Sequence, residues 1–270
     1  MPELPEVEIH ARNLRAWLVG RRIERVEVLD PKLLDDPGPL PLETAAGQRV
    51  EAVRRDAKYL FLDLEGGVTL VAHLRMTGRF VRDAYVAGPY PKFSRLALYL
   101  DSGEVVRFED RRRFGRAWLV PAGEERSLPE LRELGPDALL QPISVERLTE
   151  AAGKTRRPIK VLLMDQTLLG GLGNICVIEV LYRARIAPER PANSLTPEEL
   201  RRLAEGIPLF LEWAIEAQSR RELIYLGEKG AENVFTIYRR EGTPCPTCGG
   251  AIVYTTLGGR GTYACPSCQS

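Results

Sequence analysis

The spacing of apolar positions divides the chain into a β-rich first part and a helical second part. Apolar residues recur at near-helical spacing over 6–18, and Gly20 follows as a stop signal, so we expect a helix there. Short β-like runs separated by Gly, Pro or Asp fill residues 19–120, which is typical of an antiparallel sandwich or barrel. The expected strands are 23–29, 49–54, 59–64, 68–74, 96–100, 105–108 and 117–120.

The pattern changes after about residue 121, where a linker with one short helix extends to Pro142. Helical spacing then predicts helices at 144–151, 159–169, 175–185 and from Thr196 to about 217. From Val234 the pattern turns to β and ends in a cysteine-rich segment. The fold class is therefore α+β, and 270 residues are enough for two ordinary domains with their own cores.

The composition is that of a soluble globular protein, with 44% hydrophobic and 28% charged residues. No apolar run approaches the roughly 18 residues of a membrane span. Charged residues between Glu3 and Arg15 stand where a secretory signal needs an apolar stretch. We therefore expect a cytoplasmic protein without a membrane partner.

The basic residues are skewed towards arginine, with 32 Arg against 6 Lys, although the net charge is only +1. The planar fork of arginine suits phosphate. Genomic base composition or surface ion pairs would explain the same skew. The basic residues cluster at 54–58, 111–116 and 156–160. The positions of these clusters in the fold distinguish phosphate binding from the other two explanations.

Four of the five cysteines form two Cys-x2-Cys pairs, whereas Cys176 stands alone in an apolar helical pattern as an expected core residue. The paired residues are Cys245, Cys248, Cys265 and Cys268. Two such pairs supply four thiolates for one tetrahedral Zn²⁺ in a small β-ribbon, and a closed thiolate shell makes the metal structural. Two disulfides are the alternative, which fits a cytoplasmic chain poorly.

Two glycine-rich turns are candidate contact sites, and the first of them suits a phosphate. Residues 170–174 read Gly-Gly-Leu-Gly-Asn before a predicted helix, which leaves backbone N–H groups and the helix dipole pointing outward. Asn174 would donate to a phosphate oxygen or cap the helix, and a tight corner between helices also requires glycine. Glycines around Arg260 indicate a hairpin tip that presents a guanidinium, or else a solvated turn.

Two loop tips combine a large apolar residue with basic ones. Residues 73–78 read His-Leu-Arg-Met-Thr-Gly and residues 110–115 read Asp-Arg-Arg-Arg-Phe-Gly, each at the end of a β-like run. Met76 and Phe114 could be ordinary core residues. Exposed beside arginine, they would instead be wedges between base pairs, as in proteins that kink DNA. His73 taken alone would be a structural histidine.

The chain starts Met-Pro-Glu-Leu-Pro-Glu. Removal of Met1 would make Pro2 a secondary amine, and a chain-start amine titrates near neutral pH and can form a Schiff base with an electrophilic carbon. Glu3 is an adjacent proton carrier. A chain start before a capped helix is the plainer interpretation, and six residues alone cannot separate the two.

Together these motifs resemble the formamidopyrimidine-DNA glycosylase family, bacterial base-excision enzymes that share a superfamily with endonuclease VIII. The resemblance spans the whole chain, and Leu4 is similar to the formamidopyrimidine branch because the endonuclease VIII branch usually has Gly there. Six pieces carry it in order, at 2–8, 57–60, 73–78, 110–115, 171–175 and 260–265.

The resemblance implies a two-domain fold with DNA in the cleft between the domains. A catalytic N-terminal antiparallel β-sandwich with flanking helices would span 1–125. A helical helix-two-turn-helix domain would span 126–233, and a four-cysteine zinc-ribbon finger would span 234–270. It also implies one structural Zn²⁺, no small-molecule cofactor, and a monomer that acts on damaged double-stranded DNA.

The same resemblance implies a bifunctional DNA glycosylase and abasic-site lyase of base excision repair. Pro2 would attack C1′ of the damaged nucleotide, Glu3 would handle protons at the sugar, and Lys58 would contact the lesion-side phosphate and assist. Met76, Arg112 and Phe114 would fill the gap left by the flipped nucleotide. His73, Asn174 and Arg260 would grip phosphates around it.

Some positions depart from the family pattern: Asp56, Arg111 and Cys176 stand where a basic residue, Pro and Tyr are usual. The largest departure is 219–236, which is shorter and lacks the Gly-Gly-[Ser/Thr]-Thr-Leu motif and the Gly/Pro-rich loop that closes over 8-oxoguanine. We therefore expect ring-opened purines, oxidised pyrimidines or abasic sites to be better substrates than 8-oxoguanine, with an endonuclease VIII-like specificity as an alternative.

Two other classes of function remain as rivals. A non-catalytic DNA-damage sensor could keep the scaffold, but the presence of Pro2, Glu3 and Lys58 argues against it. A zinc-ribbon module tied to transcription or RNA would leave the Met76 and Phe114 tips unexplained.

Overall fold

The computed structural model describes residues 2–35, 37–84, 90–219, 224–226 and 228–270. The chain forms two compact units. The first contains Pro2, Glu6–Glu133 and the described residues of 224–229, and the second contains Glu3–Pro5, the described residues of 134–222 and 230–270. The zinc-ribbon segment thus shares a unit with the helices, and the expected boundaries at 125 and 233 stay a prediction.

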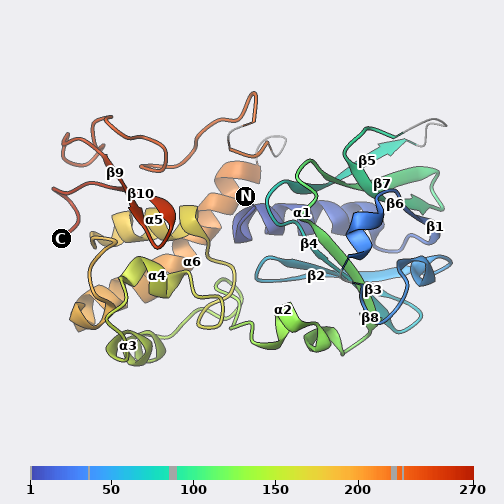
Figure 1. The fold of residues 1–270 in the computed structure, drawn as a ribbon, viewed down its shortest axis with the longest axis horizontal. Coiled ribbons are helices and arrows are strands. Elements are labelled where there is room, and N and C mark those ends of the chain that lie inside the picture. The colour runs from blue at the N-terminus through green and yellow to red at the C-terminus, as the bar shows by residue number, and fades with distance from the viewer. Residues whose placement is uncertain (1, 36, 85–89, 220–223, 227) are drawn as a thin grey trace. The chain divides into compact units, whose positions relative to one another are not determined.

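The first unit is built from helix α1 (Leu4–Leu18) and two four-stranded antiparallel sheets (Figure 1). One sheet has the strand order β1-β6-β7-β5 and the other β2-β3-β4-β8. The strands are β1 (Ile23–Val28), β2 (Val50–Asp56), β3 (Tyr59–Leu64), β4 (Val68–His73), β5 (Gly78–Ala84), β6 (Ser94–Leu100), β7 (Glu104–Asp110) and β8 (Arg116–Pro121). All seven predicted strands are confirmed.

Strand β5 was not predicted from the sequence. Its sequence, Gly-Arg-Phe-Val-Arg-Asp-Ala, does not alternate regularly between apolar and polar residues, and only Gly78 and Phe80 are buried, so the strand does not stand out. It pairs with β7 over its whole length, from Gly78 opposite Asp110 to Ala84 opposite Glu104. Pairing with a buried neighbour therefore defines this strand more than its own composition does.

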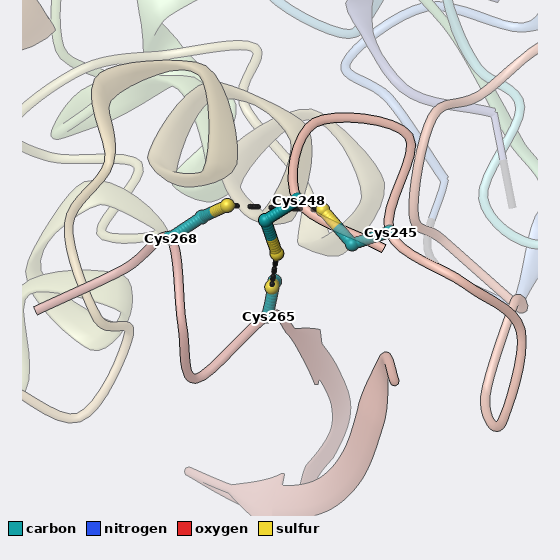
Figure 2. Close-up of side chains that lie close together, drawn as sticks. All are labelled: Cys245, Cys248, Cys265 and Cys268. Atoms are coloured by element: carbon teal, nitrogen blue, oxygen red, sulfur yellow. Dashed lines mark hydrogen bonds between the residues drawn. The ribbon is translucent and has the colours of Figure 1, made fainter. Parts of the chain in front are cut away.

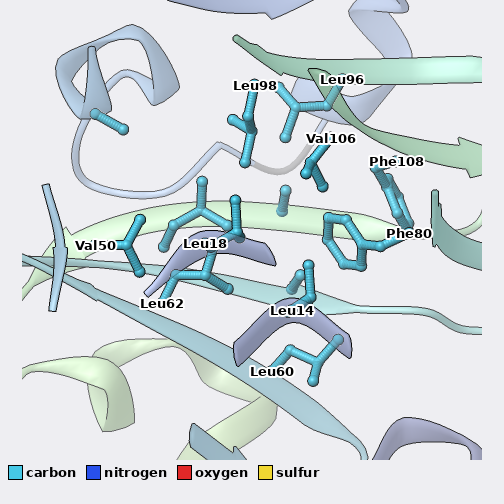
Figure 3. Close-up of a cluster of buried hydrophobic side chains, with 14 of the residues drawn as sticks. Leu14, Leu18, Val50, Leu60, Leu62, Phe80, Leu96, Leu98, Val106 and Phe108 are labelled. Carbon is cyan, nitrogen blue, oxygen red and sulfur yellow. The ribbon is translucent and has the colours of Figure 1, made fainter. Parts of the chain in front are cut away.

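A single apolar cluster joins α1 to both sheets of the first unit. Leu14 and Leu18 of α1 lie among Leu60 and Leu62 of β3 and Leu98 of β6, all fully buried (Figure 3). The apolar face of α1 thus packs against both sheets, and the three elements share one hydrophobic core. This core fixes the position of α1, and hence of the chain start that leads into it.

The second unit contains four α-helices and one 3₁₀ turn within its described residues, whereas α2 (Pro129–Arg132) belongs to the first unit. Three are short: α3 (Val145–Gly153), α4 (Ile159–Leu163) and α5 (Asn174–Ala184). The long helix α6 (Pro197–Ser219) confirms the predicted one, and the remaining helical turn is a 3₁₀ turn at Ala192–Ser194. No helix in the described ranges combines the length and the apolar character that crossing a membrane requires.

The predicted helix at 159–169 is too long, because α4 ends at Leu163. The carboxylate of Asp165 accepts hydrogen bonds from the backbone N–H and the hydroxyl of Thr167, at 3.1 and 2.7 Å. An Asp side chain that bonds the backbone two residues on favours a turn over a helix. The local competition of Asp165 therefore explains the early end.

The β character expected from Val234 onwards is confirmed only in part. The hairpin of β9 (Val253–Leu257) and β10 (Arg260–Ala264) forms, but no strand begins at Val234. Instead, the backbone N–H groups of Thr236, Ile237 and Tyr238 donate to the fully buried carboxylate of Glu179, at 2.9–3.0 Å. These N–H groups are used by a side chain of α5 and are therefore not available to a neighbouring strand.

Buried histidine also shapes the first unit. The Tyr225 hydroxyl donates to the Gly78 carbonyl oxygen, so the Nε2–H of His10 donates to the Tyr225 oxygen at 2.8 Å. The Nδ1 of His10 is buried and has no hydrogen-bond partner in the described structure. Burial, aided by the charge of Arg79, lowers the pKa of His10 to about 3.

Protonation of His10 is expected to destabilise the fold in acid. The pKa of an unfolded histidine is about 6.5, so between that value and about pH 3 only the unfolded chain takes up the proton. Stability is therefore full above about pH 6.5 and is lost as pH falls towards the folded pKa. A His10→Asn variant should lose this contribution, and its free energy of unfolding should fall less steeply between pH 6 and 4, by up to about 1.4 kcal/mol per pH unit. Urea denaturation at a series of pH values measures the slope, and equal slopes in both proteins would contradict the assignment.

Candidate active site

The start of the chain docks on the N-terminus of α5. The two carboxylate oxygens of Glu3 accept hydrogen bonds from the backbone N–H groups of Ile175 and Cys176, each at 2.9 Å. Leu4 donates its N–H to the carbonyl oxygen of Gly171 at 3.2 Å. Glu3 is 2% exposed and Leu4 is fully buried. Residues 3 and 4 are therefore fixed from both the side chain and the backbone.

The glycines of the 170–174 turn are required by this docking. A Cβ on Gly173 would lie 2.2 Å from the Cδ of Glu3, and a Cβ on Gly171 would lie 2.4 Å from a Leu4 methyl carbon. Gly171 also has φ of +107°, which L side chains rarely adopt. Glycine is needed here because the chain start approaches the turn closely.

This arrangement corrects the expectation that the α5 N-terminus is an open phosphate site. The carboxylate of Glu3 already occupies the anion-binding position that a helix N-terminus offers. The capping alternative for Asn174 is also wrong, because Gly173 is the N-cap and Asn174 is the first helical residue. The side-chain N–H of Asn174 donates to the Gly261 carbonyl oxygen at 2.9 Å, while its Oδ1 is buried without a hydrogen-bond partner in the described structure.

The hairpin that carries Arg260 is confirmed. Leu257 pairs with Arg260 across a two-residue turn, Gly258-Gly259, in which both residues have positive φ, as a tight hairpin turn of this length requires. The side chain of Arg260 is exposed beside this tip. Together with the Asn174 contact, this places Asn174 and the Arg260 hairpin side by side in the second unit.

Lys160 is buried against the hairpin that carries Arg260. It is therefore not available as a surface phosphate-binding residue. It is fully buried, and its Nζ donates to the Thr262 hydroxyl at 2.7 Å and lies 3.4 Å from the Arg260 carbonyl oxygen. Burial, together with the nearby charge of Arg260, lowers the pKa of Lys160 to about 8. The basic cluster at 156–160 is therefore split between surface and interior.

Lys58 lies at the tip of the β2–β3 hairpin in the first unit. Asp56 pairs with Tyr59, so Ala57 and Lys58 form the connecting turn, with Ala57 in the left-handed region at φ of 52°. Lys58 is only 8% exposed. A buried lysine at a strained turn has a fixed position, which suits a role in contacting one particular phosphate.

His73 ends strand β4 directly opposite Tyr59, and its ring packs edge-on against that tyrosine at 4.5 Å between centroids. Burial, then the charges of Arg75 and Lys58, lower the pKa of His73 well below its usual value. Its Nδ1 accepts a hydrogen bond from the Arg75 backbone N–H at 2.9 Å. The imidazole is therefore neutral with its proton on Nε2, which remains a donor.

Asp110 organises both apolar loop tips. The carboxylate is 1% exposed and accepts hydrogen bonds from the backbone N–H groups of Arg112, Phe114 and Gly115, at 3.1, 2.8 and 2.7 Å. It also accepts a hydrogen bond from the hydroxyl of Thr77 in the other loop. The Met76 turn and the 111–115 loop are thus joined through one side chain.

The structure decides between core and surface for these tips. Phe114 is 44% exposed, and the Arg112 guanidinium lies 4.9 Å above its ring. Met76 is half-buried in the turn that precedes Gly78. An exposed aromatic ring stacked with arginine, next to a methionine, forms an apolar surface with positive charge, and core packing does not account for it.

Several arginines of the basic clusters form ion pairs, which supports the plainer explanation for those arginines. Arg54 binds Asp63 through two hydrogen bonds, and Arg55 pairs with Glu8 at 2.8 Å. Arg113 binds Asp30 through two hydrogen bonds, at 2.6 and 2.7 Å. Of the 111–113 run, Arg113 therefore holds the loop in place while Arg112 points to the Phe114 ring.

The four paired cysteines lie together in the second unit, with all Sγ atoms within 4.8 Å of one another (Figure 2). The Sγ atoms of Cys245 and Cys268 are 3.8 Å apart and those of Cys248 and Cys265 are 3.5 Å apart. Disulfides need about 2.05 Å, so all four are free thiols. Tetrahedral Zn–S bonds of about 2.3 Å place sulfurs about 3.8 Å apart. The residues fit one structural zinc ion, and the Tyr182 hydroxyl lies 3.2 Å from the Cys245 Sγ as an outer contact.

The site residues expected from the sequence fall into two groups. Pro2, Lys58, His73, Met76, Arg112 and Phe114 belong to the first unit, and Glu3, Asn174, Arg260 and the four cysteines belong to the second. The structure brings Lys58 near His73, joins the two loop tips through Asp110, and joins Asn174 to the Arg260 hairpin. Sequence reasoning missed the supporting roles of Asp110, Glu179 and Tyr225. Of these three residues, only Asp110 belongs to a motif singled out from the sequence, the Asp-Arg-Arg-Arg-Phe-Gly stretch at 110–115.

The first unit combines helix α1 with an antiparallel sandwich, and the second unit combines helices with a four-cysteine finger. Residues 1–117 match the formamidopyrimidine-DNA glycosylase N-terminal domain, residues 134–223 match the H2TH domain of that glycosylase, and residues 242–270 match a zinc finger found in FPG and IleRS. The three matches follow one another along the chain, as the motifs do.

Relatives agree over the full length. A formamidopyrimidine-DNA glycosylase from Pelotomaculum thermopropionicum is 42% identical, over 100% of this chain and 99% of its own length. The crystal structure of the MutM (Fpg) protein from Thermus thermophilus is 40% identical with a TM-score of 0.84, covering 99% of this chain and 98% of that one. Lactococcus lactis Fpg in complex with abasic-site DNA is 31% identical with a TM-score of 0.88, and both chains are covered completely. The chain belongs to the formamidopyrimidine-DNA glycosylase family.

Zinc binding should depend on the paired cysteines and not on Cys176. The purified chain is expected to hold one zinc ion, a Cys248→Ser variant to lose most of it, and a Cys176→Ser variant to keep it, because Cys176 is buried on α5 apart from the cluster. Colorimetric zinc release after thiol modification measures the content. Equal zinc content in Cys248→Ser and the unmodified chain would contradict the assignment.

Proposed function

We propose that the protein is a bifunctional DNA glycosylase and abasic-site lyase that removes damaged bases from double-stranded DNA. The observation that carries the proposal is the docking of Glu3 on α5, which fixes the residue next to the Pro2 amine. A nucleophile needs a fixed position to convert its reactivity into rate. Membership of the family and a relative solved with abasic-site DNA support the choice of substrate.

In the proposed reaction the Pro2 nitrogen forms a bond to C1′ while the bond from C1′ to the base breaks, and the base leaves with a proton. The C1′–O4′ bond then breaks, O4′ takes up a proton, and the lone pair of the Pro2 nitrogen forms a double bond to C1′, which gives a cationic Schiff base (an iminium ion). This cation acidifies the hydrogens on C2′, so loss of one C2′ proton expels the 3′ phosphate and cleaves the strand. Base removal and strand cleavage are therefore successive steps of one mechanism.

Glu3 is the proposed proton carrier at the sugar. Each carboxylate oxygen accepts one backbone N–H bond, and these two bonds hold the carboxylate in a fixed orientation directly after Pro2. General acid–base catalysis by a positioned carboxylate contributes roughly 100- to 10,000-fold. Lys58, held at its hairpin tip, is the proposed contact for the lesion-side phosphate.

The proposed DNA contacts divide into wedges and clamps. Extrusion of a nucleotide costs about a few kcal/mol of stacking. Met76, Arg112 and Phe114 would fill the gap, with Arg112 facing the orphaned base. His73 would donate from Nε2, and Asn174 and Arg260 from their neighbouring positions, to phosphates. Arg54, Arg55 and Arg113 form internal ion pairs. We therefore propose that the wedge and clamp residues supply most of the specific contacts with DNA.

The lesion class follows from the segment between α6 and the finger. Residues 220–223 and 227 lie outside the described residues, so this part of the expectation rests on sequence. The segment is short and lacks the Gly-Gly-[Ser/Thr]-Thr-Leu motif. We propose ring-opened purines, oxidised pyrimidines and abasic sites as better substrates than 8-oxoguanine. We also propose that the protein is a monomer that acts on DNA in the cytoplasm.

Trapping by borohydride should require a free Pro2 amine. Chains that start at Pro2 are expected to form a covalent adduct with an abasic-site duplex, because borohydride reduces the Schiff base. Chains that retain Met1 should trap at least about 100-fold more slowly, with DNA affinity within about threefold because phosphate contacts are unchanged. Met1 lies outside the described residues, so intact mass has to establish which form is present. Equal trapping by both forms would contradict the proposal.

Lesion preference is tested on duplexes that differ only in one nucleotide. Single-turnover excision of a ring-opened purine or an oxidised pyrimidine should exceed that of 8-oxoguanine by at least about tenfold, a difference of roughly 1.4 kcal/mol in transition-state stabilisation. An undamaged duplex is the control. Faster excision of 8-oxoguanine than of the other lesions would show that the shortened segment does not limit specificity.

A further inference from the structure

The most unusual feature of the first unit is a segment from far along the chain. The described residues of 224–229 are grouped with the first unit, although helix α6 before them and residues 230–270 after them belong to the second. Tyr225 is 6% exposed, and its ring lies beneath the Arg79 guanidinium at 4.9 Å. Glu228 binds the same guanidinium at 2.5 and 2.6 Å. We call Tyr225 and Glu228 with their partners His10, Gly78 and Arg79 the Tyr225 clamp.

The clamp connects two parts of the proposed active site. The Tyr225 hydroxyl donates to the carbonyl oxygen of Gly78 at 2.5 Å and accepts from the Nε2–H of His10 at 2.8 Å. His10 lies on α1, the helix that follows Pro2 and Glu3. Gly78 closes the turn that carries Met76, by donating its N–H to the Leu74 carbonyl oxygen at 2.9 Å. One hydroxyl therefore ties the nucleophile's helix to the base of the Met76 turn.

The position of Gly78 leaves little freedom at this point. A Cβ on Gly78 would lie 2.4 Å from the Leu74 carbonyl oxygen and 2.9 Å from the Phe108 ring. Gly78 also pairs with Asp110, the residue that holds the Phe114 loop. A displacement of Gly78 would therefore be transmitted to both apolar tips.

We propose that Tyr225 is a positioning residue for the glycosylase reaction. Its hydroxyl keeps the Met76 turn in register with α1, so that filling the gap in the duplex and presenting the Pro2 amine occur in one geometry. This inference rests on the proposed function. It assigns to Tyr225 and Glu228 a role in the first unit that the lesion preference of the segment does not require.

The test compares two tyrosine-to-phenylalanine variants. Tyr225→Phe keeps the ring and its stacking with Arg79 but removes both hydroxyl hydrogen bonds. Tyr99→Phe is the matched control, because the Tyr99 hydroxyl also donates at 2.5 Å to a partner in the first unit, Glu27, and its ring also lies beneath an arginine, Arg25. The control residue is on β6 and touches neither α1 nor the Met76 turn through these bonds.

Two measurements separate positioning from packing. The first is the single-turnover rate of borohydride trapping at saturating abasic-site duplex. The second is the fluorescence of 2-aminopurine opposite a tetrahydrofuran abasic analogue, which reports gap filling without any covalent step. Tyr225→Phe should trap about tenfold more slowly and give a smaller fluorescence change, with DNA affinity within about twofold of the unmodified chain. Tyr99→Phe should match the unmodified chain in all three.

The outcomes are distinct. Equal rates and equal fluorescence in the two variants would overturn the clamp and leave Tyr225 as a packing residue. If circular dichroism shows that Tyr225→Phe does not fold, Glu228→Gln replaces it, and an unchanged rate and fluorescence in that variant overturn the clamp as well. Absence of any trapped adduct with the unmodified chain would instead contradict the proposed function, while the fluorescence still decides whether Tyr225 positions the Met76 turn.

Discussion

The carboxylate of Glu3 at the N-terminus of α5 is the constraint on which the site depends. Two backbone N–H groups of the helix hold both oxygens, and the glycines at 171 and 173 leave room for the approach. A helix N-terminus favours a negative charge, so the chain's own acid occupies a position that would otherwise suit a phosphate. The consequence is that the residue beside Pro2 has a fixed position although it stands at the start of the chain, where chains are usually loose.

A buried carboxylate that accepts several backbone N–H bonds also occurs at two other positions near the proposed site residues. Asp110 accepts three backbone N–H bonds and orders the Phe114 loop, and Glu179 accepts three and holds the segment that leads to the finger. Each is a buried carboxylate whose negative charge is stabilised by converging donors, which is costly to arrange but rigid once satisfied. Buried hydrogen bonds therefore hold the backbone of such loops, while arginines at the loop surface remain exposed. Arg112 and Arg260 are examples.

Sequence reasoning reached the strands, the main helices, the finger and the Arg260 hairpin because each of these is encoded by local spacing. It failed mainly where a distant partner determines the structure, and once where a local turn replaces the end of a predicted helix. Strand β5 exists because β7 lies beside it, and the backbone after Val234 turns to Glu179, 57 to 59 positions away. The helix after Pro158 ends early through a turn at Asp165, which a periodicity count does not register. The basic clusters looked alike in sequence, but Arg54, Arg55 and Arg113 are bound to acids that only the fold brings near.

The account depends most on the identity of the nucleophile, and mapping the site of covalent attachment tests it directly. The borohydride-reduced complex with an abasic-site duplex would be digested with nuclease and protease, and the sugar remnant located by tandem mass spectrometry. The account predicts the remnant on the amine of Pro2, in the peptide that contains Glu3. A remnant on Lys58 or on another lysine, with the Pro2 peptide unmodified, would contradict it.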